Sequence, residues 1–105
     1  MRRGDVHVVT LSRQAGHEPA GRRYGVVVQS EAVGILSTVV IAPTSTRTEP
    51  TNFRPEIDLL GRRTAVVTDH LRTIDRRKVG RRVHRLSSNE LRAVDDALKI
   101  VLGLL

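Results

Sequence analysis

The sequence predicts a small, mainly β fold, an antiparallel barrel closed by one C-terminal helix. Most apolar residues fall in short runs of strand length, and loops rich in glycine, proline and hydroxyl side chains separate these runs. A capped amphipathic pattern ends the chain, with no internal repeat or low-complexity tract before it. The chain has 105 residues, too few for two stable cores, so we expect residues 1–105 to form a single domain.

The first half of the chain predicts three strands. Residues 6–11 are rich in β-branched side chains, and the polar segment 12–22 that follows is long for a hairpin connection, which indicates a binding role. Residues 25–29 and 38–42 are continuous apolar runs, typical of central, buried strands. Residues 43–52 hold two prolines and five hydroxyl side chains, so we expect a loop there.

The second half predicts further strands and the helix. Residues 53–58 indicate an edge strand, because Pro55 has no N–H to donate to a neighbour. Residues 64–68 match another buried strand, and residues 71–74 and 79–86 can continue the sheet. Ser87 and Glu90 then form a capping box, and apolar residues follow at three- and four-residue steps, so a helix begins at Ser87.

The formal net charge of +7 indicates a polyanionic partner, with nucleic acid as the leading class. Six basic residues crowd into one ten-residue stretch: Arg76, Arg77, Lys78, Arg81, Arg82 and Arg85. The cluster as a whole favours phosphate binding. For any single arginine, a solvated edge strand kept soluble by its charge is an equally good interpretation.

The composition also excludes several kinds of site. The chain has no cysteine, so disulfides and thiolate chemistry are ruled out, and four scattered histidines do not indicate a zinc site. We therefore expect no metal and no cofactor. No apolar stretch approaches a membrane span, and the N-terminus lacks the apolar core of a signal peptide. These features predict a cytoplasmic protein with no membrane partner.

Six segments resemble, in order and spacing, the MazF/PemK family of toxin endoribonucleases, including its Kid branch. The resemblance covers nearly the full chain, and it depends on the order of the segments because none of them is specific alone. They are residues 3–6, residues 15–18, residues 21–29 (where Tyr24 and Gly25 replace a proline and a valine), residues 40–46, residues 69–75 and residues 86–104.

This resemblance implies both a fold and a function. The implied fold is an SH3-like barrel of the CcdB/MazF type that forms a homodimer, with an RNA groove across the dimer. The implied activity is metal-independent, sequence-specific cleavage of single-stranded RNA in a type II toxin–antitoxin system, leaving a 2′,3′-cyclic phosphate and a 5′-hydroxyl. The implied partners are mRNA, with tRNA and rRNA also as candidates, and an acidic MazE-like antitoxin.

Four residues are candidates for catalysis. Cutting RNA without a metal needs a base for the 2′-hydroxyl, a positive group on the phosphorane oxygens and a donor to the departing oxygen. Arg23 matches the family's catalytic arginine, and a strand-end surface charge is its alternative role. Ser45 matches the catalytic threonine, although a one-residue slip would select Thr46 or Thr44 instead. His17 is a candidate base or acid because imidazole titrates near neutral pH.

A second group of residues is assigned to RNA binding. Tyr24 is placed to stack on a base, and we assign Asp69 and His70 to base reading, as the resemblance implies. The remaining members of this group are Glu18, Thr44 and Arg72. His7 and His84 lie within predicted strands and are interpreted as structural. Asp75 and Arg72 are expected to form a turn or an ion pair and not a catalytic dyad.

Two other functions remain open on sequence grounds. A CcdB-like toxin that inhibits DNA gyrase would share the barrel but not the nuclease, and a basic RNA-binding module would bind RNA without cutting it. Leu59, Leu60 and Leu104 lack obvious partners in a 105-residue barrel, which favours a homodimer.

Overall fold

The computed structural model describes residues 1–12 and 20–104, which form a curved sheet and one α-helix. The elements in chain order are β1 (Asp5–Leu11), β2 (Gly21–Val27), η1 (Glu31–Val33), β3 (Thr38–Ser45), β4 (Glu56–Leu59), β5 (Arg62–Val66), η2 (Thr68–His70), β6 (Arg72–Asp75), η3 (Arg76–Lys78), β7 (Val79–Arg85) and α1 (Ser88–Leu102). The η elements are single 3-10 turns.

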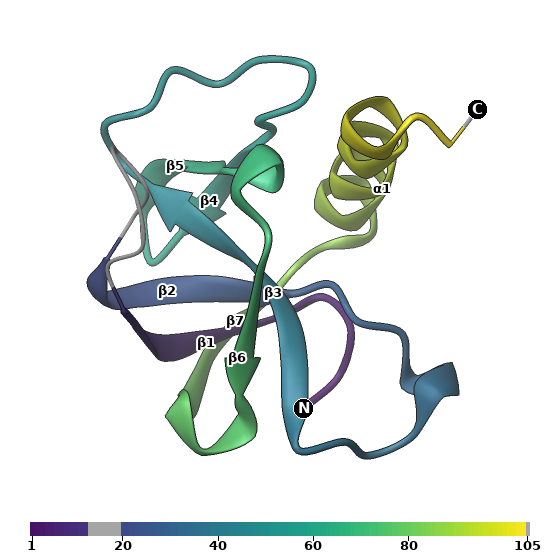
Figure 1. Ribbon diagram of the computed structural model, residues 1–105. Helices are drawn as coiled ribbons and strands as arrows, with labels where there is room; N and C mark the ends of the chain where they lie inside the picture. The colour runs from purple at the N-terminus through teal and green to yellow at the C-terminus, as the bar shows by residue number, and fades with distance from the viewer. Residues whose placement is uncertain (13–19, 105) are drawn as a thin grey trace.

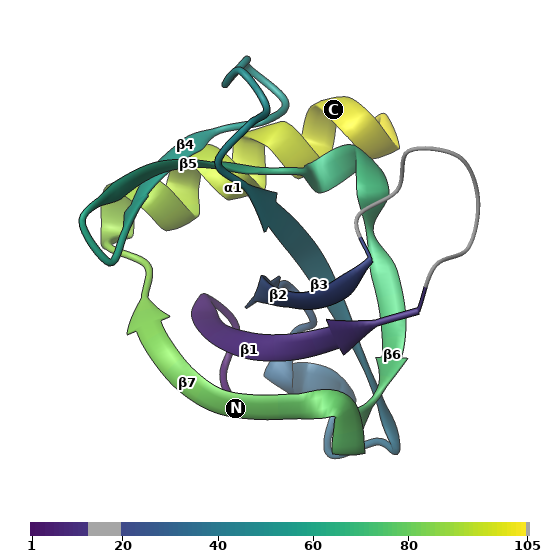
Figure 2. The ribbon, with the colours of Figure 1, turned by 90° about the vertical axis from the view of Figure 1, so that its left-hand side faces the viewer.

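All strand pairs in the sheet are antiparallel, in the order β4-β5-β3-β2-β1-β7, and β6 pairs with the first half of β3. β3 crosses the molecule, because its first residues pair with β6 and its last two with β5 (Figure 1). Figure 2 shows the sheet curling round, with α1 lying across one end beside β4 and β5. The predicted small antiparallel barrel with one C-terminal helix is confirmed.

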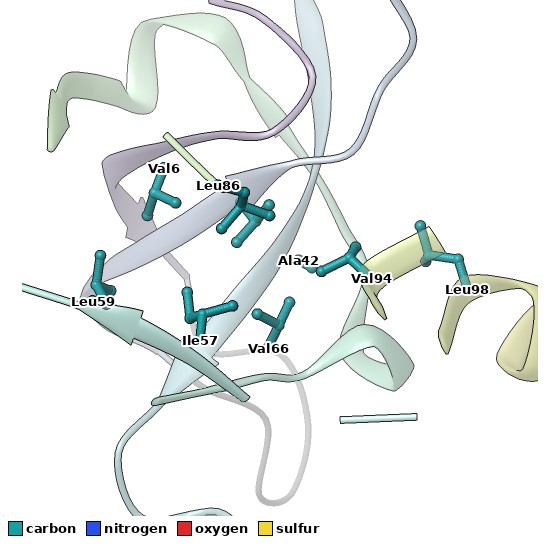
Figure 3. Close-up of a cluster of buried hydrophobic side chains, with 9 residues drawn as sticks. Val6, Ala42, Ile57, Leu59, Val66, Leu86, Val94 and Leu98 are labelled. Atoms are coloured by element: carbon teal, nitrogen blue, oxygen red, sulfur yellow. The ribbon is translucent and has the colours of Figure 1, made fainter. Parts of the chain in front are cut away.

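Two apolar clusters hold the sheet together from opposite faces of β1 and β2. Side chains alternate along a strand, so Val6 enters one cluster and Val9 the other. The larger cluster contains residues from each of the strands β1, β2, β3, β4 and β5 and from the helix. Figure 3 shows Val94 and Leu98 of α1 beside this core. Continuous apolar runs in the central strands arise because these strands are covered on both faces.

The helix begins where the sequence predicts. The Ser87 hydroxyl accepts a hydrogen bond from the Glu90 amide at 3.1 Å, and the Glu90 carboxylate accepts one from the Ser87 amide at 2.9 Å. The second oxygen of that carboxylate accepts from the Asp58 amide at 2.9 Å, so the capping box also fastens α1 to β4. The helix ends at Gly103, whose φ of 68° is left-handed.

The expectation of a loop over residues 43–52 is wrong at its start, because β3 continues to Ser45. Pro43 is the last residue of β3 paired with β2, and Thr44 is the first paired with β5. A proline suits this position, since the strand changes partner there and its carbonyl still accepts from the Val67 amide at 2.8 Å. The change of partner leaves the Thr44 and Ser45 side chains at the end of the sheet.

The edge strand expected over residues 53–58 begins later, after Pro55, and runs to Leu59. A two-residue turn of Leu60 and Gly61 then leads to β5, and both turn residues have positive φ, 54° and 80°. Leu59 is buried in the core, so the sequence analysis was wrong to count it among the apolar residues without a partner. No helix in the described part of the chain is long and apolar enough to cross a membrane.

Candidate active site

A cavity of about 400 Å³ lies where the start of β2, the end of β3 and the β4–β5 hairpin meet. We call it the catalytic cleft after the candidate catalytic residues on its wall. Five of the candidate site residues line it: Arg23, Tyr24, Thr44, Ser45 and Thr46. The remaining lining residues are Val8, Arg22, Leu59, Leu60, Arg62 and Thr64. Segments about 20 residues apart in the sequence are thus brought to one concave surface.

Arg23 stands at the exposed start of β2, opposite Val9 of β1. Its Nε donates a 3.0 Å hydrogen bond to the Ala20 carbonyl, which orients the guanidinium. That bond uses one of the five N–H donors of the group. The hydrogen bond to Ala20 is what we expect of a surface charge at the end of a strand. The position of Arg23 on the cleft wall also allows its guanidinium to donate to two oxygens of a bound phosphate.

The three hydroxyl candidates have different surroundings. Thr44 is buried, and its hydroxyl donates to the Tyr24 carbonyl at 2.8 Å, so its proton is already committed. The Ser45 oxygen accepts from the Arg47 and Thr48 amides at 3.1 and 3.2 Å, which leaves its O–H to donate elsewhere. Thr46 is exposed at the cleft. Ser45 and Thr46 therefore remain candidates, and Thr44 is better explained as a structural hydroxyl.

Arg22 and Arg62 also line the cleft, and the sequence analysis did not select either. Adjacent residues of a strand point to opposite faces, so strand alternation alone would place Arg22 away from the side of Arg23. Both arginines nevertheless line one cavity, because β2 begins at the open rim of the sheet, where both faces meet solvent.

The sequence over residues 2–102 matches the family described as the PemK-like, MazF-like toxin of type II toxin–antitoxin systems. The chain belongs to this family. A Mycobacterium tuberculosis protein named as a candidate toxin, Rv3098A, is 38% identical over 104 residues, covering 97% of both chains. Since members of the MazF/PemK family are endoribonuclease toxins, membership assigns this chain to that enzyme class.

Solved structures of the family have the same fold. The crystal structure of MazF from Deinococcus radiodurans is 28% identical with a TM-score of 0.81, over 99% of this chain and 97% of that one. A MazE–MazF complex from the same organism is 27% identical with a TM-score of 0.75, over 100% and 97%. The implied CcdB/MazF-type barrel is therefore shown by sequence and by structure.

Three residues assigned to RNA binding do not line the catalytic cleft of this MazF/PemK member. Asp69 is held by Arg54 through two hydrogen bonds of 2.9 and 2.6 Å, and the hydrogen bond from that guanidinium lowers the pKa of the Asp69 carboxyl. His70 lies beside it, with Nε2 3.8 Å from Asp69 Oδ2. Arg72 is buried, and its Nη2 donates to the Ser12 carbonyl at 2.9 Å, so it binds the chain just after the end of β1.

His17 and Glu18 lie outside the described residues, so their roles stay predictions. His7 and His84 have structural partners, as expected. His7 is buried with Nδ1 2.8 Å from the Gly80 carbonyl, and His84 lies 3.4 Å from the Glu90 carboxylate. Among residues 1–12 and 20–104, no group of histidine and carboxylate side chains is arranged to hold a metal ion.

The basic cluster is divided between structure and surface. Arg85 donates to the buried Asp5 carboxylate at 2.8 Å, and Arg82 lies 3.8 Å from the same oxygen. Burial raises the pKa of Asp5, but its bonds to Arg85 and to the Arg2 amide outweigh burial, and the net shift is downward. Asp75 accepts from the Arg77 amide at the start of η3, so it forms the expected turn, and its ion-pair partner at 2.8 Å is Arg77.

Proposed function

We propose that this toxin cleaves single-stranded RNA at specific sequences and without a metal ion. The observation that carries the proposal is the meeting of Arg23 with two available hydroxyls, on Ser45 and Thr46, in one basic cleft. The 2′-hydroxyl gives its proton to a base and its oxygen attacks the neighbouring phosphorus, and the bond from phosphorus to the 5′-oxygen breaks. The products are a 2′,3′-cyclic phosphate and a 5′-hydroxyl, once the departing oxygen takes a proton.

Each group has a distinct role in this scheme. Arg23 places forked N–H donors on the phosphorane oxygens, where charge develops in the transition state. The Ser45 hydroxyl, with its oxygen fixed by two loop amides, donates to a phosphate oxygen and holds the in-line geometry. Tyr24 offers its ring to a base, and His17 supplies the base or acid. Target RNAs are mRNA first, in the cytoplasm, with tRNA and rRNA as further candidates.

The test is cleavage of a single-stranded RNA in chelator by the Arg23→Ala variant. Losing one charged donor to a transition-state oxyanion costs about 3 to 4 kcal/mol, so the rate should fall roughly a thousandfold. Arg23→Lys should recover little, because an ammonium cannot reach two oxygens with forked geometry. Arg63→Ala, on an exposed arginine outside the cleft, is the matched control. Cleavage by Arg23→Ala at the parental rate would exclude the proposed catalytic role of Arg23.

The same gel assay separates the hydroxyl candidates and the competing functions. Ser45→Ala should lose most cleavage, whereas loss in Thr46→Ala alone would move the role by one residue. A protein that binds the RNA but leaves it intact would match the basic RNA-binding module. A protein that leaves RNA intact and inhibits DNA gyrase would match the CcdB-like alternative.

A homodimer is proposed from an apolar groove between α1 and the sheet. The groove has a volume of about 530 Å³ and is lined mainly by Val28, Val40, Leu71, Leu98, Leu102 and Leu104. Leu102 and Leu104 are 52% and 62% exposed, which is unusual for large apolar side chains unless a partner covers them. Light scattering in moderate salt should give a dimer, and a mass near 11.7 kDa would refute it.

An acidic MazE-like antitoxin is the proposed regulator. The family belongs to type II toxin–antitoxin systems, and a relative of this chain has been solved as a MazE–MazF complex. A chain with a net charge of +7 favours a partner segment with the charge of RNA. Affinity for the antitoxin should weaken as salt rises, and an affinity independent of salt would contradict this electrostatic account.

A further inference from the structure

A second cavity opens beside the catalytic cleft and shares part of its wall. It has a volume of about 550 Å³ and is lined by Val8, Thr10, Arg22, Asp75, Arg77, Lys78, Val79 and Gly80. Val8 and Arg22 also line the catalytic cleft, so the two hollows adjoin. We call the second hollow the flanking cavity. It lies over β1, η3 and the start of β7, and none of its lining residues is a candidate for catalysis.

The strand register explains why the two hollows face the same side. Val8 lies opposite Tyr24 and Thr10 lies opposite Arg22, so these four side chains share one face of β1 and β2. Tyr24 belongs to the catalytic cleft, Thr10 to the flanking cavity, and Arg22 to both. A ligand that leaves the cleft past Arg22 can therefore cross β1 without turning round the edge of the sheet.

The flanking cavity is basic at both ends. Arg22 stands at the side nearest the cleft, and Arg77 and Lys78 of η3 stand at the far side, against a single acid, Asp75. The Arg77 side chain is 90% exposed, and Asp75 holds it in place through a 2.8 Å ion pair. Gly80 also lines the cavity and places no side chain in it. A Cβ there would come within 3.1 Å of the Val8 carbonyl, so β7 needs glycine to approach β1.

We propose that the flanking cavity binds the phosphates of RNA nucleotides next to the cleaved bond. This inference rests on the proposed function of the catalytic cleft and extends its substrate contacts. Arg22, Arg77 and Lys78 give positive charge at both ends of a hollow continuous with the cleft, which suits a strand with one negative charge per nucleotide. The site recognises the backbone and not the base sequence, because its polar groups are mainly cationic.

The test measures binding of single-stranded 2′-O-methyl oligonucleotides, which lack the attacking hydroxyl. The variant is Arg77→Gln/Lys78→Gln, compared on oligonucleotides of about four and about twelve nucleotides. Two lost phosphate contacts should weaken the longer oligonucleotide about tenfold at moderate salt and reduce its salt slope by about 1.4. The shorter oligonucleotide fills the cleft alone, so its affinity should change no more than in the control.

The control is Arg63→Gln/Arg92→Gln, which removes the same charge. Arg63 is exposed and paired with Glu56 at 2.6 Å, as Arg77 is with Asp75, and Arg92 is exposed on α1. Neither residue lines the two hollows. The proposal would be overturned if the variant and the control lost the same affinity for the long oligonucleotide. It would also be overturned if Arg77→Gln/Lys78→Gln lost the same affinity for the short and the long oligonucleotides.

A second variant should act in the opposite direction. Asp75→Asn removes the acid from the cavity, and asparagine can still cap η3 by accepting from the Arg77 amide. It should increase the affinity for the long oligonucleotide several-fold and leave the affinity for the short one unchanged. Weaker binding of the long oligonucleotide by Asp75→Asn would overturn the proposal. The proposal would also be overturned if Arg77→Gln/Lys78→Gln lost about tenfold in affinity for an acidic antitoxin peptide but lost no affinity for RNA. Because binding is measured on uncleavable strands, a failure of the proposed cleavage would not be mistaken for a failure of this site.

Discussion

Replacing Leu60 with asparagine should give a more stable protein than replacing it with alanine. Leu60 and Gly61 form the two-residue β4–β5 turn, and the φ of Leu60 is 54°, a left-handed value that asparagine tolerates well. Both variants lose the leucine side chain, so its partial burial cancels in the comparison. The difference is the backbone strain, about 1 kcal/mol in favour of asparagine.

Thermal unfolding measures this difference directly. For a domain of this size, about 1 kcal/mol corresponds to roughly 4 °C in Tm between the two variants. Gly61→Ala calibrates the effect: nothing lies within 4 Å of the added Cβ and φ is 80°, so any loss is backbone strain alone. If the alanine variant at Leu60 proved as stable as the asparagine variant, the turn would not be strained as described.

Three further predictions concern packing, capping and pH. Gly25→Ala should destabilise the fold by about 1 to 3 kcal/mol in urea unfolding, since the new Cβ would lie 3.2 Å from Val9 and 3.3 Å from Ile41. Ser87→Ala should cost about 1 kcal/mol by removing the N-cap, whereas Ser88→Ala should not. Burial raises the pKa of Glu90, but hydrogen bonds lower it more, and the net value lies below that of an unfolded glutamate. The contribution of ionised Glu90 to the free energy of unfolding is therefore complete above about pH 4.5 and is lost as the pH falls below that value. The urea midpoint of Glu90→Gln should therefore fall less steeply on acidification than that of the parent protein.

Local patterns predicted most of the fold. The capping box at Ser87 and the buried runs of β2 and β3 depend on neighbouring residues, and these elements are confirmed. The loop predicted over residues 43–52 was wrong at its start, because Thr44 and Ser45 pair with β5. No local sequence pattern indicates that pairing. The prediction that Leu59 lacks a partner was wrong for the same reason, because its neighbours in the core come from distant segments of the chain.

The site was predicted in part. The resemblance selected Arg23, Ser45 and Thr46, which the structure brings to one cleft. It could not show that Arg72 is buried, because whether an arginine faces a ligand or a backbone carbonyl depends on tertiary packing. Strand alternation would also exclude Arg22, but this rule weakens at a rim where both faces of the sheet meet solvent.

β3 also matters for the design of inhibitors. Val40 near its start lines the apolar groove, and Ser45 at its end lines the catalytic cleft, five residues and about 17 Å along the same strand. The proposed dimer covers this groove, so a small molecule bound there would displace the partner subunit and contact the strand that carries the hydroxyl, without occupying the catalytic cleft. Such a compound would act non-competitively, and resistance to it would arise at Val40 or Leu71 while the cleft residues stayed unchanged.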